Sequence, residues 1–240
     1  MNDKTKLGGL FYPTRDQAGR DIPFDSLFIP YIYREIYFEG VYVDILNQQK
    51  DMIIVDVGAN IGVTVDHFRK HAKKLYAIEP SPEHFAALEM NKKFNRWNNV
   101  ELFNYALADK DGEMEFKQAI SNRTMNSLMV GKGVVDKHGA ETIIMPGRYN
   151  EESLMVKTKS IDHFFEENNI DKVDFMKFDP EGAEEIILRS EGFKKIASKV
   201  KAIMVEFHFP NWMELVKYME ELGFTPRRYE SSAIIVLFTR

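Results

Sequence analysis

Acidic and histidine side chains follow two buried, strand-like runs in the second half of the chain. Asp179 and Glu181 come directly after one run, and Glu206 and His208 stand at the end of the next. Because neighbouring parallel strands end at the same edge of a sheet, we expect these four side chains to face one crevice. Histidine titrates near neutral pH and carboxylates accept protons, so the group is suited to general acid–base chemistry.

The same carboxylates raise the question of a metal. Asp179, Glu181 and Glu206 offer the oxygen ligands that hard divalent cations prefer. Their spacing along the chain is not that of a compact ligand motif. We therefore predict no metal site.

A glycine-containing segment, Asp56-Val-Gly-Ala-Asn-Ile-Gly62, lies where the first strand of the predicted sheet turns into a helix. We expect Gly58 to allow a sharp turn and the close approach of a ligand, and Gly62 to allow tight packing at the helix start. The exposed N–H groups of such a turn bind polar or anionic groups. The turn alone is a weak signal, because tight strand-to-helix turns are common.

An acid at the end of the second strand strengthens this signal. Glu79 follows Gly58 by 21 residues, close to the interval of about 20 at which a carboxylate binds the ribose hydroxyls of a nucleotide. Asn60 stands where a dinucleotide-binding loop has its second glycine, which lets the backbone approach a pyrophosphate. The pattern therefore favours an adenosine-containing ligand without a pyrophosphate.

The composition sets limits on partners and compartment. A chain of 240 residues with 44% hydrophobic residues can bury a sizeable core, and its net charge of −5 argues against broad binding of nucleic acids. The absence of cysteine excludes disulfides, thiolate catalysis and zinc–thiolate sites. Residues 1–20 lack the apolar stretch of a secretory signal, and no run is long enough to span a bilayer. We expect a cytoplasmic protein without a membrane partner.

From residue 51 onward, short β-branched runs alternate with helical patterns, which is typical of βαβ units and a mainly parallel sheet. The expected strands span 52–57, 74–79, 100–104, 113–118, 173–178, 201–207, 225–229 and 233–239, and the expected helices span 63–71, 82–94, 183–190 and 212–222. The last two strands lack an intervening helix, so we expect an antiparallel hairpin around residues 230–232.

Two segments fall outside this alternation. Residues 1–50 are rich in aromatic residues, and the spacing of Tyr33, Ile36 and Tyr37 suggests a helix that packs on the domain 51–240 as a cap. A cover over the substrate pocket is the alternative. Residues 119–152 have weak periodicity and are expected to form an irregular, functional or disordered loop.

Several blocks in order resemble the FkbM family of S-adenosylmethionine-dependent methyltransferases. They are the glycine segment, Glu79-Pro-Ser-Pro82, Asn104-Tyr-Ala-Leu-Ala-Asp109 with Asp111-Gly112, Lys177-Phe-Asp-Pro-Glu-Gly-Ala-Glu184 and Val205-Glu-Phe-His208. The resemblance spans roughly residues 41 to 225. It departs at Pro180, where the family usually has an aliphatic residue, which puts the aim of Asp179 in doubt.

The resemblance implies a Rossmann-like class I methyltransferase fold, with a mainly parallel seven-stranded sheet and an antiparallel C-terminal hairpin. It implies cofactor-binding roles for Asp56, Gly58, Asn60, Gly62 and Glu79, and a loop at Tyr105 and Ala106 that flanks the adenine. It also implies O-methylation of a hydroxyl on a sugar, a glycan or a small secondary metabolite.

An aliphatic hydroxyl is a poor nucleophile, so proton loss needs assistance. We expect His208 or Asp179 to be the base, with Glu181 and Glu206 shaping the pocket. Alternatively, His208 caps the helix after Pro210 or bonds a backbone carbonyl, and Asp179 contacts the methionine ammonium of the cofactor. Arg123, Asn126 and Ser127 are further candidates for the acceptor site, although each is more simply an exposed loop residue.

Three other functions remain open. A nucleic-acid or protein methyltransferase is disfavoured, because Asp179-Pro-Glu-Gly182 matches only the first two positions of the Asp/Asn-Pro-Pro-Tyr/Phe motif. An NAD-dependent oxidoreductase would need the pyrophosphate glycine, and a scaffold that has lost activity is not excluded. The acceptor and the oligomeric state are not readable from the sequence.

Overall fold

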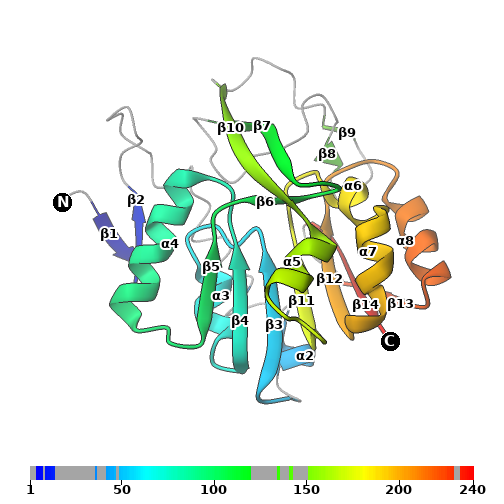
Figure 1. The fold of residues 1–240 in the computed structure, drawn as a ribbon, viewed down its shortest axis with the longest axis horizontal. Coiled ribbons are helices and arrows are strands. Elements are labelled where there is room, and N and C mark those ends of the chain that lie inside the picture. The colour runs from blue at the N-terminus through cyan, green and yellow to red at the C-terminus, as the bar shows by residue number, and fades with distance from the viewer. Residues whose placement is uncertain are drawn as a thin grey trace.

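The computed structural model describes residues 4–7, 9–13, 36, 42–46, 49–119, 134–135, 141–142, 151–229 and 233–240. Figure 1 shows one central sheet with helices packed against it and a smaller sheet crossing one end. The described strands are β1 (Lys4–Leu7), β2 (Leu10–Pro13), β3 (Met52–Val57), β4 (Ala72–Ile78), β5 (Val100–Phe103), β6 (Ala106–Ala108), β7 (Gly112–Ala119), β8 (Val134–Val135), β9 (Glu141–Thr142), β10 (Glu151–Ser160), β11 (Phe175–Phe178), β12 (Ala202–Phe207), β13 (Thr225–Arg228) and β14 (Ile234–Thr239).

The described helices are α2 (Val43–Leu46), α3 (Val63–Phe68), α4 (Pro82–Asn95), α5 (Ile161–Glu167), α6 (Glu184–Leu188), α7 (Glu191–Ile196), the 3₁₀ helix η3 (Ala197–Lys199) and α8 (Trp212–Glu221). Within the described ranges, no helix has the length and apolar character needed to cross a membrane.

The central sheet has seven strands in the order β13-β14-β12-β11-β3-β4-β5. Strands β5, β4, β3, β11 and β12 pair in parallel, whereas β14 pairs antiparallel with both β12 and β13. This confirms the predicted mainly parallel sheet and its antiparallel C-terminal pair, although the turn at residues 230–232 lies outside the described residues. The chain order reverses beside β3, so the carboxyl ends of β3, β4 and β11 meet where such sheets bind ligands.

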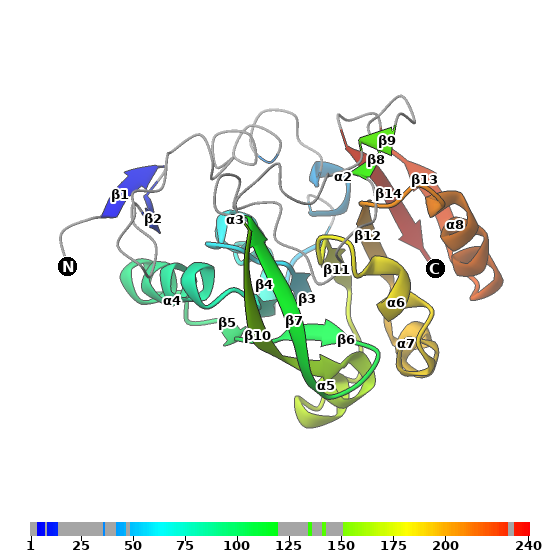
Figure 2. The same ribbon diagram turned by 90° about the horizontal axis from the view of Figure 1, so that it is seen from above.

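The inner strands β3, β11, β12 and β14 are buried on both faces, which explains their nearly continuous apolar runs, whereas the edge strand β13 is largely exposed. Val55 and Val57 of β3 pack into one hydrophobic cluster, with Phe164 of α5 and Phe193 of α7. Ile54 points to the opposite face and packs into a second cluster. Figure 2 shows α2 and α3 on one side of the sheet and α5, α6 and α7 on the other. This alternation at period two fixes the register of the strands.

Described parts of residues 1–50 contribute to the second cluster. Leu10, Ile36, Tyr42 and Leu46 are buried there. The ring of Tyr42 meets that of Phe68 edge-on, with centroids 4.9 Å apart. Tyr33 and Tyr37 of the expected helix lie outside the described residues, and a cap formed by residues 1–50 stays a prediction.

The irregular loop predicted over residues 119–152 overlaps a strand at each end. Residue 119 closes β7 and residue 151 opens β10, which pair antiparallel from Ala119↔Glu151 to Gly112↔Thr158. β10 also pairs in parallel with β6, which forms a separate three-stranded sheet. Between these ends the structure describes only the short pair of β8 and β9.

Other element boundaries also differ from the sequence-based expectation. β6, β10, α5 and α7 were not predicted at all, and β11 begins at Phe175 rather than at residue 173. Helix α3 ends at Phe68 rather than at residue 71. Helix α8 ends at Glu221, and Gly223 follows with φ +89° and donates to the carbonyl of Glu220, close to the predicted termination.

Gly62 stands where the first loop of the sheet enters α3, and it confirms the expectation of tight packing. Its φ is +95°, and a Cβ there would lie 2.6 Å from Leu88 Cδ1 and 3.0 Å from Trp97. We predict that Gly62→Ala lowers the free energy of unfolding by about 2–4 kcal/mol, because it adds both backbone strain and overpacking.

Gly9→Ala is the matched control for this prediction. Gly9 has φ +90°, and a Cβ there would meet no atom of the described residues within 4 Å. Gly9→Ala should therefore lower the free energy of unfolding by backbone strain alone, about 1 kcal/mol. Chemical denaturation measures both variants. Equal losses for the two variants would contradict the packing argument.

Candidate active site

The loop from Asp56 to Gly62 carries the turn that joins β3 to α3. Asn60 has φ +50°, a left-handed conformation that asparagine tolerates better than most residues. The N–H groups of Gly58 and Ala59 both donate to the carbonyl of Ile78 at 3.0 Å. These bonds hold the loop against the end of β4, next to Glu79.

Gly58 is required for the predicted sharp turn and also for a contact that the sequence did not suggest. Its φ is +79°, as a sharp turn demands, yet a Cβ there would lie 2.0 Å from the carbonyl oxygen of Asp179. The space expected for a ligand is therefore occupied by the backbone that follows β11. Gly58 lets the loops after β3 and β11 touch.

Glu79 is anchored to the glycine loop. Its Oε2 accepts the N–H of Asn60 and its Oε1 accepts the N–H of Ser81, both at 2.8 Å. The side chain is nearly buried, and each carboxylate oxygen has a second lone pair for a further donor. The loop and the acid that were predicted to bind one nucleotide thus form one unit.

Beyond Glu79, the loop after β5 differs in part from the expectation. The Asn104 amide donates to the carbonyls of Glu79 at 2.9 Å and Pro80 at 3.2 Å. Tyr105 is half-buried at this end of the sheet, and burial raises the pKa of its hydroxyl. Ala106 is not in a loop: it begins β6 and is buried against β10. Ala106 contributes backbone rather than an accessible side chain.

Lys177, in the middle of β11, joins the glycine loop to the end of its own strand. Its Nζ donates to Asp179 Oδ2 at 2.9 Å and to the carbonyl of Gly58 at 3.3 Å, and it lies 3.8 Å from Asp56 Oδ1. Burial acts to lower the pKa of Lys177, but Asp179 and Asp56 outweigh burial and raise it. The lysine is therefore a buried, paired cation.

Asp56 is fully buried beside this cation. Thr64 Oγ1 donates to Asp56 Oδ2 at 2.5 Å, whereas Oδ1 has no hydrogen-bond partner among the described residues. Burial raises the pKa of Asp56 to about 6, although Lys177 and Thr64 oppose the shift. The unsatisfied oxygen faces the charge of Lys177 at 3.8 Å, which is beyond hydrogen-bond distance.

The four predicted acid–base residues do meet in one cluster. His208 Nε2 lies 3.5 Å from Glu181 Oε2, 3.6 Å from Glu206 Oε1 and 3.8 Å from Asp179 Oδ1. Its Nδ1 lies 2.8 Å from Oε1 of Glu184. Both ring nitrogens face carboxylates, so His208 serves neither as a cap of α8 nor as a partner of a backbone carbonyl.

The charges in this cluster shift one another. Burial acts to lower the pKa of His208, but Glu181 and Glu184 outweigh it and hold that pKa well above 6.5. Burial raises the pKa of Glu181 well above its ordinary value of 4.5, although His208 opposes the shift. Burial also acts to raise the pKa of Asp179, but Lys177 and His208 keep it below its ordinary value.

Backbone strain is concentrated in the turn after Asp179. Glu181 has φ +53° and the following Gly182 has φ +100°. A left-handed glutamate is uncommon and costs about 1–2 kcal/mol, and such strain gathers at functional sites. This conformation places the carboxylate of Glu181 near His208. With Pro180 in the turn, the carboxylate of Asp179 still lies near both Lys177 and His208.

A divalent cation could also be held in this region. Asp179, Glu206 and His208 each present one ligand atom, and these atoms all lie within 4.8 Å of one another. The spacing along the chain did not reveal this arrangement. The prediction of no metal is untested by this geometry and stays a prediction.

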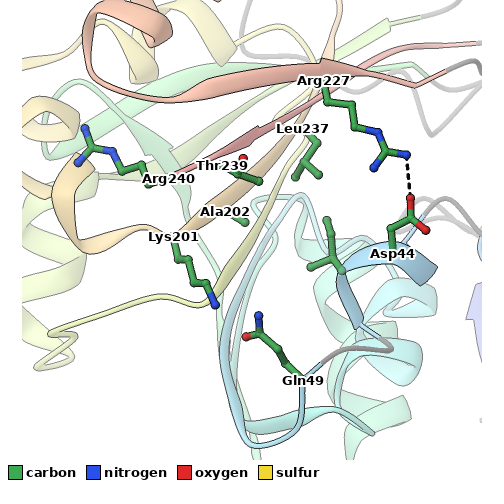
Figure 3. A pocket seen from close by; sticks show the side chains of 9 residues that line it. Asp44, Gln49, Lys201, Ala202, Arg227, Leu237, Thr239 and Arg240 are labelled. Carbon is green, nitrogen blue, oxygen red and sulfur yellow. Dashed lines mark hydrogen bonds and ion pairs between the residues drawn. The ribbon is translucent and has the colours of Figure 1, made fainter.

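A second concavity lies far from this cluster. An open groove of about 440 Å³ lies between α2, the start of β12 and the C-terminal strands. Figure 3 shows the side chains that line it. Its wall includes Lys201, Arg240 and the ion pair of Arg227 with Asp44. Ligands of open α/β sheets bind at the carboxyl ends of the strands, so this groove, which lies at the opposite ends, is not the candidate active site.

Sequence reasoning missed three members of the site. Lys177, Thr64 and Glu184 were given no role, although a lysine inside the apolar run Phe175–Phe178 is a readable sign of a buried ion pair. Thr64 and Glu184 look like ordinary residues of helix starts. Arg123, Asn126 and Ser127 lie outside the described residues.

Comparison with known proteins identifies the family of this chain. The model of the methyltransferase FkbM domain matches residues 56–226, which include both loops and the His208 cluster. The chain belongs to the FkbM methyltransferase family. It is 27% identical over 176 residues to "Methyltransferase 1" of Beauveria bassiana, covering 70% of this chain and 69% of that protein.

Two further relatives of this FkbM methyltransferase are informative. It is 22% identical over 164 residues to "2-O-methyltransferase NoeI" of Sinorhizobium fredii, covering 68% of this chain and 65% of that protein. Precorrin-6y C5,15-methyltransferase from Geobacter metallireducens has a similar fold, with a TM-score of 0.50 and 12% identity over 95% of this chain and 100% of that one. The fold is thus that of class I methyltransferases.

The buried Asp56 of this FkbM methyltransferase generates a stability prediction. A carboxyl whose pKa is raised by folding stabilises the protein below pH 3.8, and that contribution is lost as the pH rises through about 6. Asp56→Asn removes this pH dependence, whereas the loss of a charged partner for Lys177 is felt at both pH values. We therefore expect the stability of the variant relative to the native chain to be about 1–3 kcal/mol more favourable at pH 7.5 than at pH 4.

Urea denaturation at the two pH values measures this difference. Thr64→Val, which removes the hydroxyl donor of Asp56 but keeps its charge, is the control and should destabilise at pH 7.5. An Asp56→Asn variant that is less stable at pH 7.5 than at pH 4, relative to the native chain, would contradict the assigned shift.

Proposed function

We propose that this chain is an S-adenosylmethionine-dependent O-methyltransferase that methylates a hydroxyl of a sugar, a glycan or a small secondary metabolite. The observation that carries the proposal is the contact between two loops at one edge of the sheet. One loop presents Glu79 beside the glycine turn, and the other presents the His208 cluster. Lys177 joins the two through Gly58 and Asp179.

The carboxylates at this edge of the sheet are hydrogen-bond acceptors that fit S-adenosylmethionine. Glu79 retains acceptor capacity for the ribose hydroxyls. The side chain of Asp179 is 18% exposed and its Oδ1 receives no hydrogen bond from the described residues, which suits the ammonium of the methionine part. Asp56 is fully buried and acts on that ammonium through its charge alone. Asn60 replaces the glycine that a pyrophosphate needs, so a dinucleotide fits less well.

S-adenosylmethionine supplies an electrophilic methyl group on a sulfonium with a good leaving group. What the chain must add is position and proton removal, because an aliphatic hydroxyl is a weak nucleophile. His208 Nε2 is the proton acceptor in this proposal, and Glu181, Glu206 and Asp179 surround it. Their carboxylates stabilise the imidazolium that forms when the proton arrives.

Two arguments support a hydroxyl acceptor over other classes. The turn Asp179-Pro-Glu-Gly182 lacks the aromatic residue that stacks on an extruded base, and the chain is acidic. NoeI, one of the relatives, is named as a 2-O-methyltransferase. We therefore expect a small-molecule or glycan acceptor rather than a nucleic acid.

Glu79→Gln tests the cofactor part of the proposal. The amide replaces one acceptor oxygen of Glu79 by an NH₂ donor, and this donor faces the N–H of Asn60 or Ser81, which is also a donor. The side chain then loses an acceptor for the ribose hydroxyls, so the affinity for S-adenosylhomocysteine should fall at least about tenfold. Isothermal titration calorimetry measures it. Glu89→Gln, an exposed change on the same side of the sheet in α4, is the control and should bind as the native chain does.

Methyl transfer itself is tested with radiolabelled S-adenosylmethionine and a panel of glycans and hydroxylated metabolites. Labelled product from a hydroxyl acceptor supports the proposal. Tight binding of NAD with none of S-adenosylhomocysteine, or methylation confined to nucleic acid, would reject it.

The same proposal sets the pH dependence of turnover. A base acts in its unprotonated form, and the pKa of His208 lies well above 6.5 because Glu181 and Glu184 face it. The rate kcat should therefore rise with pH through a midpoint above 6.5 and lose about tenfold per pH unit below it. A rate that is flat between pH 5.5 and 8.5 would exclude His208 as the base.

A further inference from the structure

Glu184 is the most deeply buried member of the His208 cluster. It opens α6 with no exposed surface, so no substrate can touch it in this structure. Its Oε1 accepts the N–H of Gly182 at 2.8 Å and lies 2.8 Å from His208 Nδ1. Burying a carboxylate is costly unless it is paired, and the imidazole is its charged partner.

The contact dictates where the histidine keeps its proton. An ionised carboxylate is only an acceptor, so the Nδ1 that faces it must be the donor. The lone pair of a neutral His208 is then on Nε2, which faces the three carboxylates of Asp179, Glu181 and Glu206 rather than the core. The ring is thereby held with its basic nitrogen toward the partly exposed side of the cluster.

We infer that Glu184 is a positioning residue for methyl transfer: it fixes the tautomer and the orientation of His208 so that Nε2 is the atom that takes the proton of the acceptor hydroxyl. This inference rests on the proposed function and deepens it. The proton moves from the hydroxyl oxygen to Nε2 as the oxygen forms its bond to the methyl carbon and the carbon–sulfur bond breaks.

The surroundings of His208 are charged on several elements, and each affects its titration. Asp179 and Glu181 face it from the turn after β11, Glu184 from α6 and Glu206 from β12, while Lys177 offsets part of the charge of Asp179. Glu184 differs from the other carboxylates in one respect: it alone among them contacts Nδ1.

The direct test is the tautomer of His208 in the native protein. Nitrogen-15 NMR of the labelled full chain, free and with S-adenosylhomocysteine, reads which ring nitrogen carries the proton once the imidazole is neutral. His208→Gln identifies the resonances. We expect the proton on Nδ1 in both states. A neutral ring with its proton on Nε2 would overturn the inference, and this measurement needs no variant of Glu184.

Glu184→Gln tests the consequence for turnover. The amide oxygen can still accept from Nδ1, but the negative charge is lost and the tautomer is no longer dictated. We expect kcat to fall at least about tenfold and the acid limb of its pH profile to move down by about one unit or more. KM for the acceptor and the affinity for S-adenosylhomocysteine should stay within about twofold.

Glu185→Gln is the matched control. It removes a charge from the next position of α6, where the side chain is about a third exposed and pairs with Arg189 at 3.3 Å. Its kcat and pH profile should match those of the native chain.

Besides the NMR outcome, three results would overturn the inference. They are a folded Glu184→Gln with unchanged kcat and pH profile, a loss confined to KM or cofactor affinity, and activity that a chelator abolishes and Mg²⁺ restores. In the last case Nε2 would hold a cation rather than a proton. Failure of the native chain to bind S-adenosylhomocysteine would instead reject the proposed function, and the NMR reading of the free protein would still judge the tautomer.

Discussion

The buried ammonium of Lys177 is the interaction on which the two halves of the site depend. It lies between Asp56 and Asp179 and also bonds the carbonyl of Gly58. A buried charge without partners costs several kcal/mol, so each of these groups holds the others in place. The carbonyl of Asp179 fills the space beside Gly58, and the loops after β3 and β11 consequently form one surface.

This arrangement separates two electrostatic environments at one sheet edge. Around Lys177, the carboxyl of Asp179 has a lowered pKa and stays ionised. Around His208, Glu181 has a raised pKa and the imidazole gains affinity for a proton. Neighbouring groups whose pKa values move in opposite directions are typical of sites that transfer protons. Asp179 belongs to both environments, because it contacts Lys177 and also faces His208.

Much of this site could be predicted from the sequence because its residues stand at strand ends. Strand ends are readable from the alternation of apolar runs and helices, so the meeting of Asp179, Glu206 and His208 followed from the topology of a parallel sheet. Glu79 and the glycine loop followed in the same way. The sharp turn at Gly58 was predicted too, but its contact with the carbonyl of Asp179 was not, because that contact depends on the path of another loop that is distant in the sequence.

Other features escaped prediction for physical reasons that differ. Glu184 looks like a helix-start acid, and only its complete burial beside His208 reveals another role. β6 and β10 lie in a separate small sheet whose pairing is non-local, and the three residues of β6 are too short for a period to be read. Lys177 could be recognised in the sequence as a charge within an apolar strand. Its partners Asp56, Asp179 and Gly58 could not be identified from the sequence.

A crystal structure of the protein with S-adenosylhomocysteine would test the central claim most directly. The account predicts the ribose hydroxyls on Glu79, the amino group near Asp56 and Asp179, and the sulfur facing the side of the cluster where His208 Nε2 lies. An adenosyl group bound elsewhere, for instance in the groove lined by Lys201 and Arg240, or with its sulfur directed away from His208, would contradict it.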